Sequence, residues 1–280
     1  TGRSMWGCVR RSRIVAAALL WALAAWPAMA APPERVVSIN LCTDQLAMML
    51  AAPGQLVSVS ALAREPQSSA MVAEAMRYPV NRGQAEEVFL LDPDLVLAGS
   101  YTTPATVDML RRLGIPVVTL PPATSLDAVS DQIAQVGAAL GRAAAADRLA
   151  ADFEARRARL RAALAERPRA ALYYANGYTA GDSSLAGEIL VAAGFENVAT
   201  EAGLAQGGAL ALERLVMLAP ELVVEGARYP GASRGEALLA HPALDGLRRA
   251  GARTGGDWAC GTPHVLRAIE ELAAIRETLE

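Results

Sequence analysis

The chain has 280 residues, 53% of them hydrophobic, and a formal net charge of −3 at pH 7. This length is enough for one large domain or for two small lobes. All 26 basic residues are arginine, and they form no basic stripe along the sequence. The composition therefore excludes a protein that recognises nucleic acid or an anionic membrane surface through clustered positive charge.

The first 30 residues have the pattern of a secretory signal peptide. Arg10, Arg11 and Arg13 precede an apolar run over 14–26, and Pro27-Ala28-Met29-Ala30 supplies the small residues of a cleavage site. The apolar run is shorter than the about 20 residues that a membrane-spanning helix needs. We therefore expect export, cleavage near Ala30 and a mature protein in the periplasm. Without residues 1–30, which hold four arginines and no acidic residue, the formal charge is −7.

Short apolar strands alternate with helices along the rest of the chain. The predicted strands cover 35–39, 56–60, 95–98 and 116–120 in the first half, and 170–174 and 222–225 in the second. The predicted helices cover approximately 43–52, 70–77, 104–113, 184–193 and 234–249. Such alternation is typical of parallel sheets with helices on both faces.

The segment between the two halves has no strand signal. Residues 144–166 are rich in Ala, Leu, Arg and Glu and stop at Pro168, which predicts a long helix, and Gly141 separates it from a preceding helix. The predicted fold is therefore α/β, with two Rossmann-like lobes of mainly parallel sheet joined by one long linking α-helix. Its expected parts are the signal peptide, 1–30, the N-terminal α/β lobe, 31–125, the linking helical segment, 126–168, and the C-terminal α/β lobe with a final helix, 169–280.

An internal repeat supports two related lobes. Residues 86–99, EEVFLLDPDLVLAG, and 213–226, ERLVMLAPELVVEG, share the positions of Glu, Leu, Pro and Gly. A second pair, LRRLG at 110–114 and LRRAG at 247–251, follows at a spacing that is ten residues longer in the second half. Each half thus predicts a helix that ends at proline, a strand, and a crossing helix closed by glycine.

The candidate binding residues lie in the loops that follow the predicted strands. In doubly wound sheets, ligands meet the loops at the carboxyl ends of the strands. Trp258 corresponds to Pro121 by the second repeat, so both belong to the same loop of their lobes. Aromatic and polar side chains there suit a large, flat, amphipathic ligand; the alternative is that they only pack loop against loop. The predicted ligand-binding residues are Asn40, Cys42, Arg64, Tyr101, Tyr178, Tyr229, Asp257 and Trp258.

Two cysteines, Cys42 and Cys260, remain once Cys8 leaves with the signal peptide. Both are placed in loops at the carboxyl edge of a sheet, and an even pair in an oxidising compartment favours a disulfide. The bridge would cross from one lobe to the other. The alternatives are a pair of thiols offered to a soft metal in the ligand, and a catalytic thiol beside His264, although no family signature surrounds that cysteine.

The motifs of common enzyme classes do not occur in the sequence. No G-x-G-x-x-G opens a helix after a strand, and neither a P-loop nor H-E-x-x-H is present. Two histidines, His241 and His264, are too few for a histidine-rich metal site. We therefore expect a binding protein without catalytic residues, resident metal or cofactor. The alternative is a secreted α/β enzyme that acts on a small amphipathic substrate through a cysteine.

Several motifs together carry a resemblance to a known family: RVVSIN, GQAEEVFLLDPDLVLAG, LRRLGIPVVTL, ALERLVMLAPELVVEG, and GDW before a final helix. They are similar to those of periplasmic solute-binding proteins of ABC importers for vitamin B12, haem and ferric siderophores, over the chain from Arg35 to the end. Asp257-Trp258 resembles the aspartate–tryptophan pair in the last cleft loop of the vitamin B12-binding branch. The resemblance implies a monomer that captures a large metal chelate (a corrinoid, haem or ferric siderophore) between its lobes. It would deliver this solute to a permease dimer in the inner membrane.

The resemblance also implies a role for Glu86 and Glu213, which match the glutamates that dock each lobe to arginines of the permease. The alternative is that both carboxylates only stabilise helix N-termini through the macrodipole. The two cysteines depart from the vitamin B12-binding pattern, so the identity of the solute stays open. Haem binders of this family usually present a tyrosine or histidine to the iron, a role that Tyr101 or Tyr229 would fill, and His264 less readily because it begins the final helix.

Overall fold

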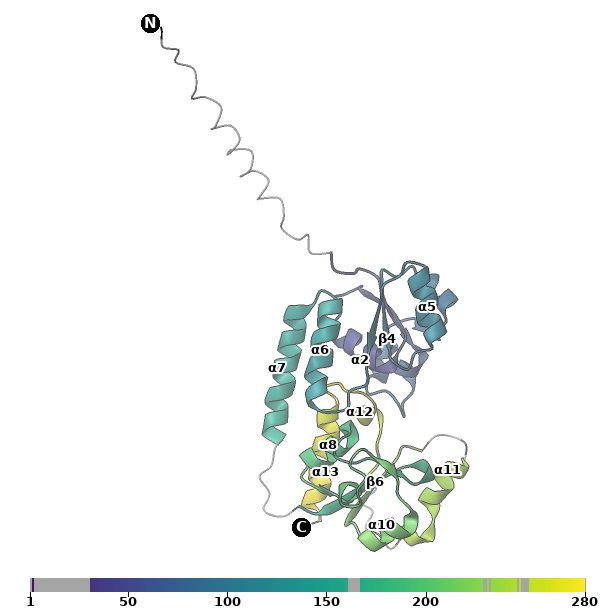
Figure 1. Cartoon of the computed structure of the whole chain (residues 1–280), viewed down its shortest axis with the longest axis vertical. Coiled ribbons are helices and arrows are strands. Elements are labelled where there is room, and N and C mark those ends of the chain that lie inside the picture. The colour runs from purple at the N-terminus through teal and green to yellow at the C-terminus, as the bar shows by residue number, and fades with distance from the viewer. Residues whose placement is uncertain are drawn as a thin grey trace. The chain divides into compact units, whose positions relative to one another are not determined.

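A computed structural model describes Gly2 and residues 31–160, 167–228, 231, 233–245, 247 and 252–279 of the chain (Figure 1). The predicted signal peptide and Tyr229 lie outside these described residues. Residues 33–280 belong to one compact unit. Within the described ranges, none of the helices combines the length and the hydropathy that crossing a membrane would require.

The first lobe is built on a five-stranded parallel sheet. Its strands are β1 (Val36–Ser38), β2 (Leu56–Ser60), β3 (Val80–Asn81), β4 (Leu95–Gly99) and β5 (Val117–Leu120), in the order β3-β2-β1-β4-β5. The four predicted strands of this lobe are confirmed, and the two-residue β3 is an addition. Because the chain leaves β1 first toward β2 and later returns to its other side with β4, the strand order reverses beside β1. Ligands of such sheets bind at this position.

Four α-helices connect the strands of the first lobe. They are α2 (Leu41–Leu50), α3 (Val72–Ala75), α4 (Ala85–Phe89) and α5 (Pro104–Arg112), with a 3₁₀ turn at Ala61–Arg64. Asn40 begins α2, because its side-chain oxygen accepts hydrogen bonds from the backbone N–H groups of Cys42 and Thr43. α5 has Pro104 in its first turn and is followed by Gly114 at φ +83°, which gives the punctuation expected from the sequence.

Two long helices, α6 (Asp127–Ala139) and α7 (Ala143–Leu160), lie side by side after β5 (Figure 1). Gly141, at φ +66°, makes the turn between them, so the predicted break at this glycine is confirmed. The helices approach closely at Gly137, where an added Cβ would lie 2.2 Å from the Cβ of Ala146. α7 is the long helix that leads toward the second lobe.

The second lobe repeats the parallel arrangement with fewer strands. Strands β6 (Arg169–Tyr173), β8 (Glu196–Asn197) and β10 (Leu222–Glu225) pair in the order β10-β6-β8, and β7 (Tyr178–Thr179) pairs antiparallel with β9 (Gly208–Ala209). The helices are α8 (Leu185–Ala192), α9 (Val198–Glu201), α10 (Leu212–Leu218), α11 (Arg234–Ala237), α12 (Gly256–Ala259) and α13 (Val265–Glu277).

The predicted helix over 234–249 is wrong. α11 ends after four residues and is followed by two 3₁₀ turns, Leu238–Ala240 and Pro242–Leu244. Pro242 has no N–H for the helical ladder, and its ring disfavours helical backbone at the preceding residue. His241 is accordingly extended (φ −69°, ψ 134°), and its Nδ1 accepts a hydrogen bond from the N–H of Ala243.

The two copies of the internal repeat occupy equivalent positions in the two sheets. β4 lies beside β1 in the first sheet, and β10 lies beside β6 in the second. Arg253 forms an isolated parallel bridge with Glu225 of β10, at the place where β5 pairs along β4 in the first sheet. The segment after Arg253, in which α12 carries Trp258, is therefore the counterpart of the segment after β5, as the repeat predicted.

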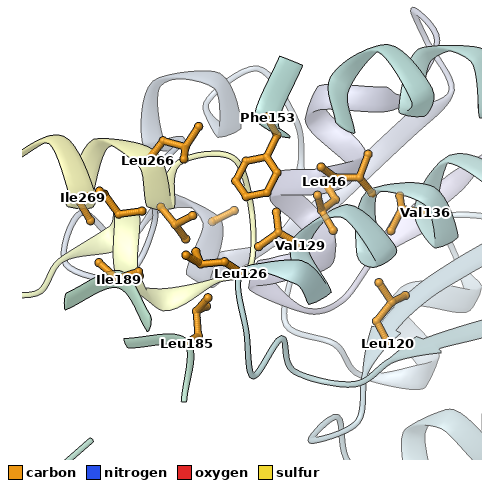
Figure 2. Packing of buried hydrophobic residues seen from close by; sticks show 14 of the residues in the cluster. Leu46, Leu120, Leu126, Val129, Val136, Phe153, Leu185, Ile189, Leu266 and Ile269 are labelled. Atoms are coloured by element: carbon orange, nitrogen blue, oxygen red, sulfur yellow. The ribbon is translucent and has the colours of Figure 1, made fainter. Parts of the chain in front are cut away.

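One buried apolar cluster is shared by helices of both lobes (Figure 2). It contains Leu46 of α2, Val129 of α6, Phe153 of α7, Ile189 of α8 and Leu266 of α13, each less than 1% exposed. Figure 2 shows Phe153 placed between Leu266 on one side and Leu46 on the other. Since removal of this apolar surface from water stabilises the contact between the helices, the lobes share a core in addition to their own.

Candidate functional site

A cavity of about 450 Å³ is lined by residues of both lobes. Its volume falls within the range of small-molecule binding sites, about 300–1,000 Å³. The first lobe contributes Leu41, Gln67 and Ser68. The second lobe contributes Tyr174, Ala175, Ala186, Gly226, Ala227, Glu236, Thr254, Gly255, Trp258 and Ala259.

The cavity lies where several parallel strands end. Leu41 follows β1 after the cap residue Asn40, Tyr174 follows β6, and Gly226 follows β10. Thr254, Gly255 and Trp258 follow the bridge at Arg253. The loops at the carboxyl ends of the strands thus meet a common cavity, which is the location predicted from the sequence.

Two aromatic side chains, Tyr174 and Trp258, line the cavity from the second lobe. Gly226 permits the close approach of Tyr174, because an added Cβ would lie 2.8 Å from Cδ1 of the ring. Burial raises the pKa of Tyr174, with a smaller contribution from Tyr178, so this phenol stays neutral and offers one donor and one acceptor. The Tyr178 ring lies beside it, with 6.3 Å between the centroids.

Trp258 was predicted from the sequence, and Tyr174 was missed. The prediction treated Tyr174 as the last residue of a strand over 170–174, whereas β6 ends at Tyr173. The next residue is therefore the first of the loop at the carboxyl edge. A predicted strand that ended one residue earlier, at Tyr173, would have placed Tyr174 among the candidate loop residues.

Three other predicted residues have structural partners and do not line the cavity. Asn40 caps α2. Arg64 donates hydrogen bonds to the carbonyl oxygens of Ala75 (3.4 Å) and Tyr78 (2.5 Å). Asp257 forms an ion pair with Arg267 of α13. These contacts shape the loops around the cavity, and contact of the three residues with a ligand stays a prediction.

Two of the predicted tyrosines, Tyr101 and Tyr178, are not among the described residues that line the cavity. Tyr101, in the loop between β4 and α5, is 88% exposed, and Tyr178 is about half exposed. Tyr229 follows Arg228 and lies outside the residues that the structure describes. No group of three or more His, Cys, Asp and Glu side chains that could hold a metal ion occurs among the described residues.

Cys42 and Cys260 form a disulfide, with 5.2 Å between their Cα atoms. The bridge joins the first turn of α2 to the loop after α12, and the prediction of a covalent link between the lobes is confirmed. Leu41 and Ala259, the neighbours of the two cysteines, both line the cavity. Because both sulfurs are oxidised, the interpretations as metal-binding thiols and as a catalytic thiol are wrong for this state.

His264 has no catalytic geometry around it. It precedes α13, and its Nε2 is buried without a hydrogen-bond partner in the described part of the chain. Burial lowers the pKa of His264, and the nearby Arg267 lowers it further, so the ring is kept neutral. The nearest cysteine in sequence, Cys260, is closed in the disulfide.

The segment that carries Trp258 packs directly against the first lobe. Thr262 Oγ1 donates a hydrogen bond to Gln45 Oε1 of α2 (3.3 Å). An added Cβ at Gly256 would lie 2.4 Å from the backbone carbon of Ser69. Glycine at position 256 therefore allows the backbones of the two lobes to meet beside the cavity.

Alanine at position 256 should lower the free energy of unfolding by about 1–3 kcal/mol, because the new methyl group overlaps backbone atoms that cannot rotate away. Gly255→Ala is the matched control, since an added Cβ there meets nothing within 4 Å. Urea unfolding of both variants measures the difference. Helix propensity alone favours alanine over glycine within α12, so an unchanged or more stable Gly256→Ala protein would show that the lobes do not touch there.

Asp44, in the first turn of α2, is a buried carboxyl group. It accepts hydrogen bonds from Ser60 N (3.1 Å) and Ser60 Oγ (2.5 Å). Burial raises the pKa of Asp44 from 3.8 to about 7, against the opposing effect of these hydrogen bonds.

The raised pKa of Asp44 predicts a pH-dependent stability. Between about pH 4 and pH 7 the folded protein keeps this proton while the unfolded chain releases it, so stability should fall as pH rises through this window and level off above it. Asp44→Asn should remove this part of the fall, and exposed Asp131→Asn should not. Free energies of unfolding from pH 4 to pH 8 test this; parallel profiles for wild type and Asp44→Asn would contradict it.

Comparisons with known proteins place the fold and the cavity in context. The family described as Periplasmic binding protein matches residues 36–253. A cobalamin-binding protein of Halobacterium salinarum is 31% identical over 243 residues, which are 83% of this chain and 64% of that relative. A vitamin B12-binding protein of Yersinia pestis is 35% identical over 125 residues, which are 43% of this chain and 42% of that relative.

Solved structures show the same fold at lower sequence identity. The apo periplasmic haem-binding protein of Roseiflexus superposes with a TM-score of 0.72 at 23% identity, over 88% of this chain and 99% of that one. The periplasmic vitamin B12-binding protein of Vibrio cholerae superposes with a TM-score of 0.64 at 19% identity, over 89% and 98% of the two chains. With the family match over most of its length and the two-lobed α/β architecture, the chain belongs to the periplasmic binding protein family.

Proposed function

We propose that the chain is the solute-binding component of an ABC importer and that it captures a corrinoid between its lobes. The observation that carries the proposal is the aromatic-lined cavity formed by loops of both lobes. Membership of the periplasmic binding protein family and similarity to a cobalamin-binding relative support it. The chain spans 64% of the length of that relative.

The charge of the cavity favours a corrinoid over the other metal chelates. Glu236 is the only charged residue among its described lining residues, and no arginine is among them. Arg228, close in sequence to the lining residues, pairs with Glu225 at 2.8 Å. The carboxylates of haem and of acidic ferric siderophores are bound most strongly by arginine, which donates paired hydrogen bonds to them. The neutral amides around a corrin ring instead match the side chains of Gln67, Ser68 and Thr254.

A corrinoid is larger than this cavity, so we propose that one part of the solute enters it and that the rest extends between the lobes. Trp258 and Tyr174 would pack against the part that enters. Apart from Cys42, which is held in the disulfide, the other predicted binding residues would contact the part outside, and each role is part of the proposal. These are Asn40, Arg64, Tyr101, Tyr178, Tyr229 and Asp257.

Calorimetric titration of the mature protein with cyanocobalamin, haemin and ferric rhizoferrin, a carboxylate siderophore, tests the proposed solute. We expect saturable one-to-one binding of cyanocobalamin and at least tenfold weaker binding of the other two, equivalent to about 1.4 kcal/mol or more. Tight binding of haemin without binding of cyanocobalamin would refute the proposal. We also propose that the protein has no catalytic activity, and recovery of chemically unchanged cyanocobalamin after incubation would support this.

Export, oligomeric state and domain boundaries form the rest of the proposal. We propose a periplasmic monomer whose first residue is near Ala31, with lobes over 31–125 and 169–280 and a linking helical segment over 126–168. The intact mass of the protein recovered from the periplasm would measure the cleavage position. Retention of the segment over 10–26 in that mass would contradict it.

Glu86 and Glu213 are proposed to dock the two lobes to the permease. Both are exposed and stand in the first turns of equivalent helices, α4 and α10. Glu86→Ala and Glu213→Ala should each slow uptake by the cognate permease severalfold while leaving solute affinity within error, because opposite charges guide such encounters. Uptake into proteoliposomes measures this, with exposed Glu271→Ala as the control. A severalfold loss of solute affinity in either variant would contradict the assignment.

A further inference from the structure

Each lobe exposes a pair of large apolar side chains beside its proposed docking glutamate. Phe89 and Leu90, which are 48% and 82% exposed, follow Glu86 by three and four residues. Val216 and Met217, which are 39% and 84% exposed, follow Glu213 at the same two spacings. We call Glu86, Phe89 and Leu90 the first pad, and Glu213, Val216 and Met217 the second pad.

The two pads occupy equivalent positions of the internal repeat. Within the same repeat, Val88 and its counterpart Leu215 are fully buried, so packing explains why both are apolar. Packing does not explain why the outward positions are apolar as well. A single exposed leucine or methionine is ordinary in a folded protein. The same exposed pair at the same place in both lobes instead indicates a surface that is covered during function.

The spacing places each glutamate with its apolar pair. On a helix, residues three and four positions apart are neighbours on one face. Glu86 begins this face on α4, and Glu213 begins it on α10. Each pad therefore combines a negative charge with adjoining apolar surface.

We infer that the two pads are matching contact surfaces for the two equivalent halves of the permease dimer, each half offering an apolar depression beside a cation. This inference rests on the proposed function. Two repeated surfaces on one chain fit two identical subunits related by a two-fold axis. An anionic lipid surface does not fit, since both pads carry a carboxylate.

The apolar pair would increase the contribution that the neighbouring glutamate makes to binding of the permease. An exposed ion pair contributes little to affinity, because water and salt screen it. Apolar side chains that exclude water around a charged contact raise its contribution, as at the centres of protein interfaces. The pads would thus supply affinity through Phe89, Leu90, Val216 and Met217, and orientation through the two glutamates.

Leu90→Ser and Met217→Ser in one full-length mature protein test the inference. The matched control is Met76→Ser, because Met76 is 60% exposed and lies outside both pads. Affinity for the cognate permease in nanodiscs is measured at low and high salt, together with thermal unfolding and cyanocobalamin affinity. We expect the double variant to bind the permease at least tenfold more weakly at both salt concentrations, with folding and solute affinity unchanged. Glu86→Gln with Glu213→Gln should lose affinity mainly at low salt.

Permease affinity equal to that of wild type in the Leu90→Ser, Met217→Ser protein would overturn the inference. So would a wild-type dimer in solution that this substitution dissociates, because a second copy of the chain would then cover the pads. A wild-type protein that binds neither cyanocobalamin nor the permease would instead refute the proposed function. The two failures are therefore distinguishable.

Discussion

Replacement of Trp258 by alanine should weaken cyanocobalamin binding by about ten- to a hundredfold. The indole lines the cavity, and burial of one such ring against a solute contributes roughly 1–3 kcal/mol. Calorimetry with the purified mature variant measures the loss. Trp258→Phe should recover part of the affinity, because it retains an apolar ring.

Two controls separate binding from folding in this experiment. Trp258 also packs against the buried cluster shared by the lobes, so thermal unfolding of each variant is recorded in parallel. Met109→Ala, at an exposed position of α5, should change neither property. Wild-type affinity in a well-folded Trp258→Ala protein would exclude contact between the indole and the solute.

Loss of the Cys42–Cys260 bridge should lower the free energy of unfolding by up to about 5 kcal/mol. The bridge joins positions that are 218 residues apart. In the chain-entropy model, a bridge that closes a loop of this length strongly lowers the conformational entropy of the unfolded chain, so its loss stabilises the unfolded state. Cys42→Ala with Cys260→Ala, compared with the oxidised wild type by urea unfolding, measures the effect. Alanine suits position 260, because Cys260 is buried and a serine hydroxyl there would need a partner.

Reduction provides an independent measure of the same bridge. A reductant should destabilise the wild type to about the level of the double variant and should leave the double variant unchanged. Solute affinity should fall as well, because Leu41 and Ala259 lie on opposite sides of the bridge and both line the cavity. Two free thiols in the unreduced, denatured mature protein, or equal stability with and without reductant, would refute the prediction.

The strands were predictable because their boundaries depend on local patterns. Leu56–Ser60 and Leu222–Glu225 are short apolar runs whose observed ends match the predicted ends. The predicted helix over 234–249 is wrong because the backbone leaves the helical conformation at Pro242, which begins a 3₁₀ turn.

The sequence predicted which segments lie near the cavity better than it predicted which side chains line it. Topology places Asn40, Arg64 and Asp257 close in sequence to residues that line the cavity, but each side chain has a partner within the protein that the sequence does not reveal. The disulfide was predicted from the compartment and from the two loops, and its 5.2 Å Cα separation depends on how the lobes meet. The cavity itself needs both lobes in place, so no single segment of sequence encodes it.

The cluster shared by α2, α6, α7, α8 and α13 has a consequence for how the chain acquires its structure. α13, which ends at Glu277, supplies Val265, Leu266 and Ile269 to a cluster whose first members are Val36 and Leu46. Contacts between residues so far apart in sequence form slowly, because a large loop must close before they stabilise the chain. We therefore expect a newly made chain to remain unfolded until α13 has left the ribosome, a property that refolding kinetics would measure. An export machinery that accepts only unfolded polypeptide would then have time to engage it.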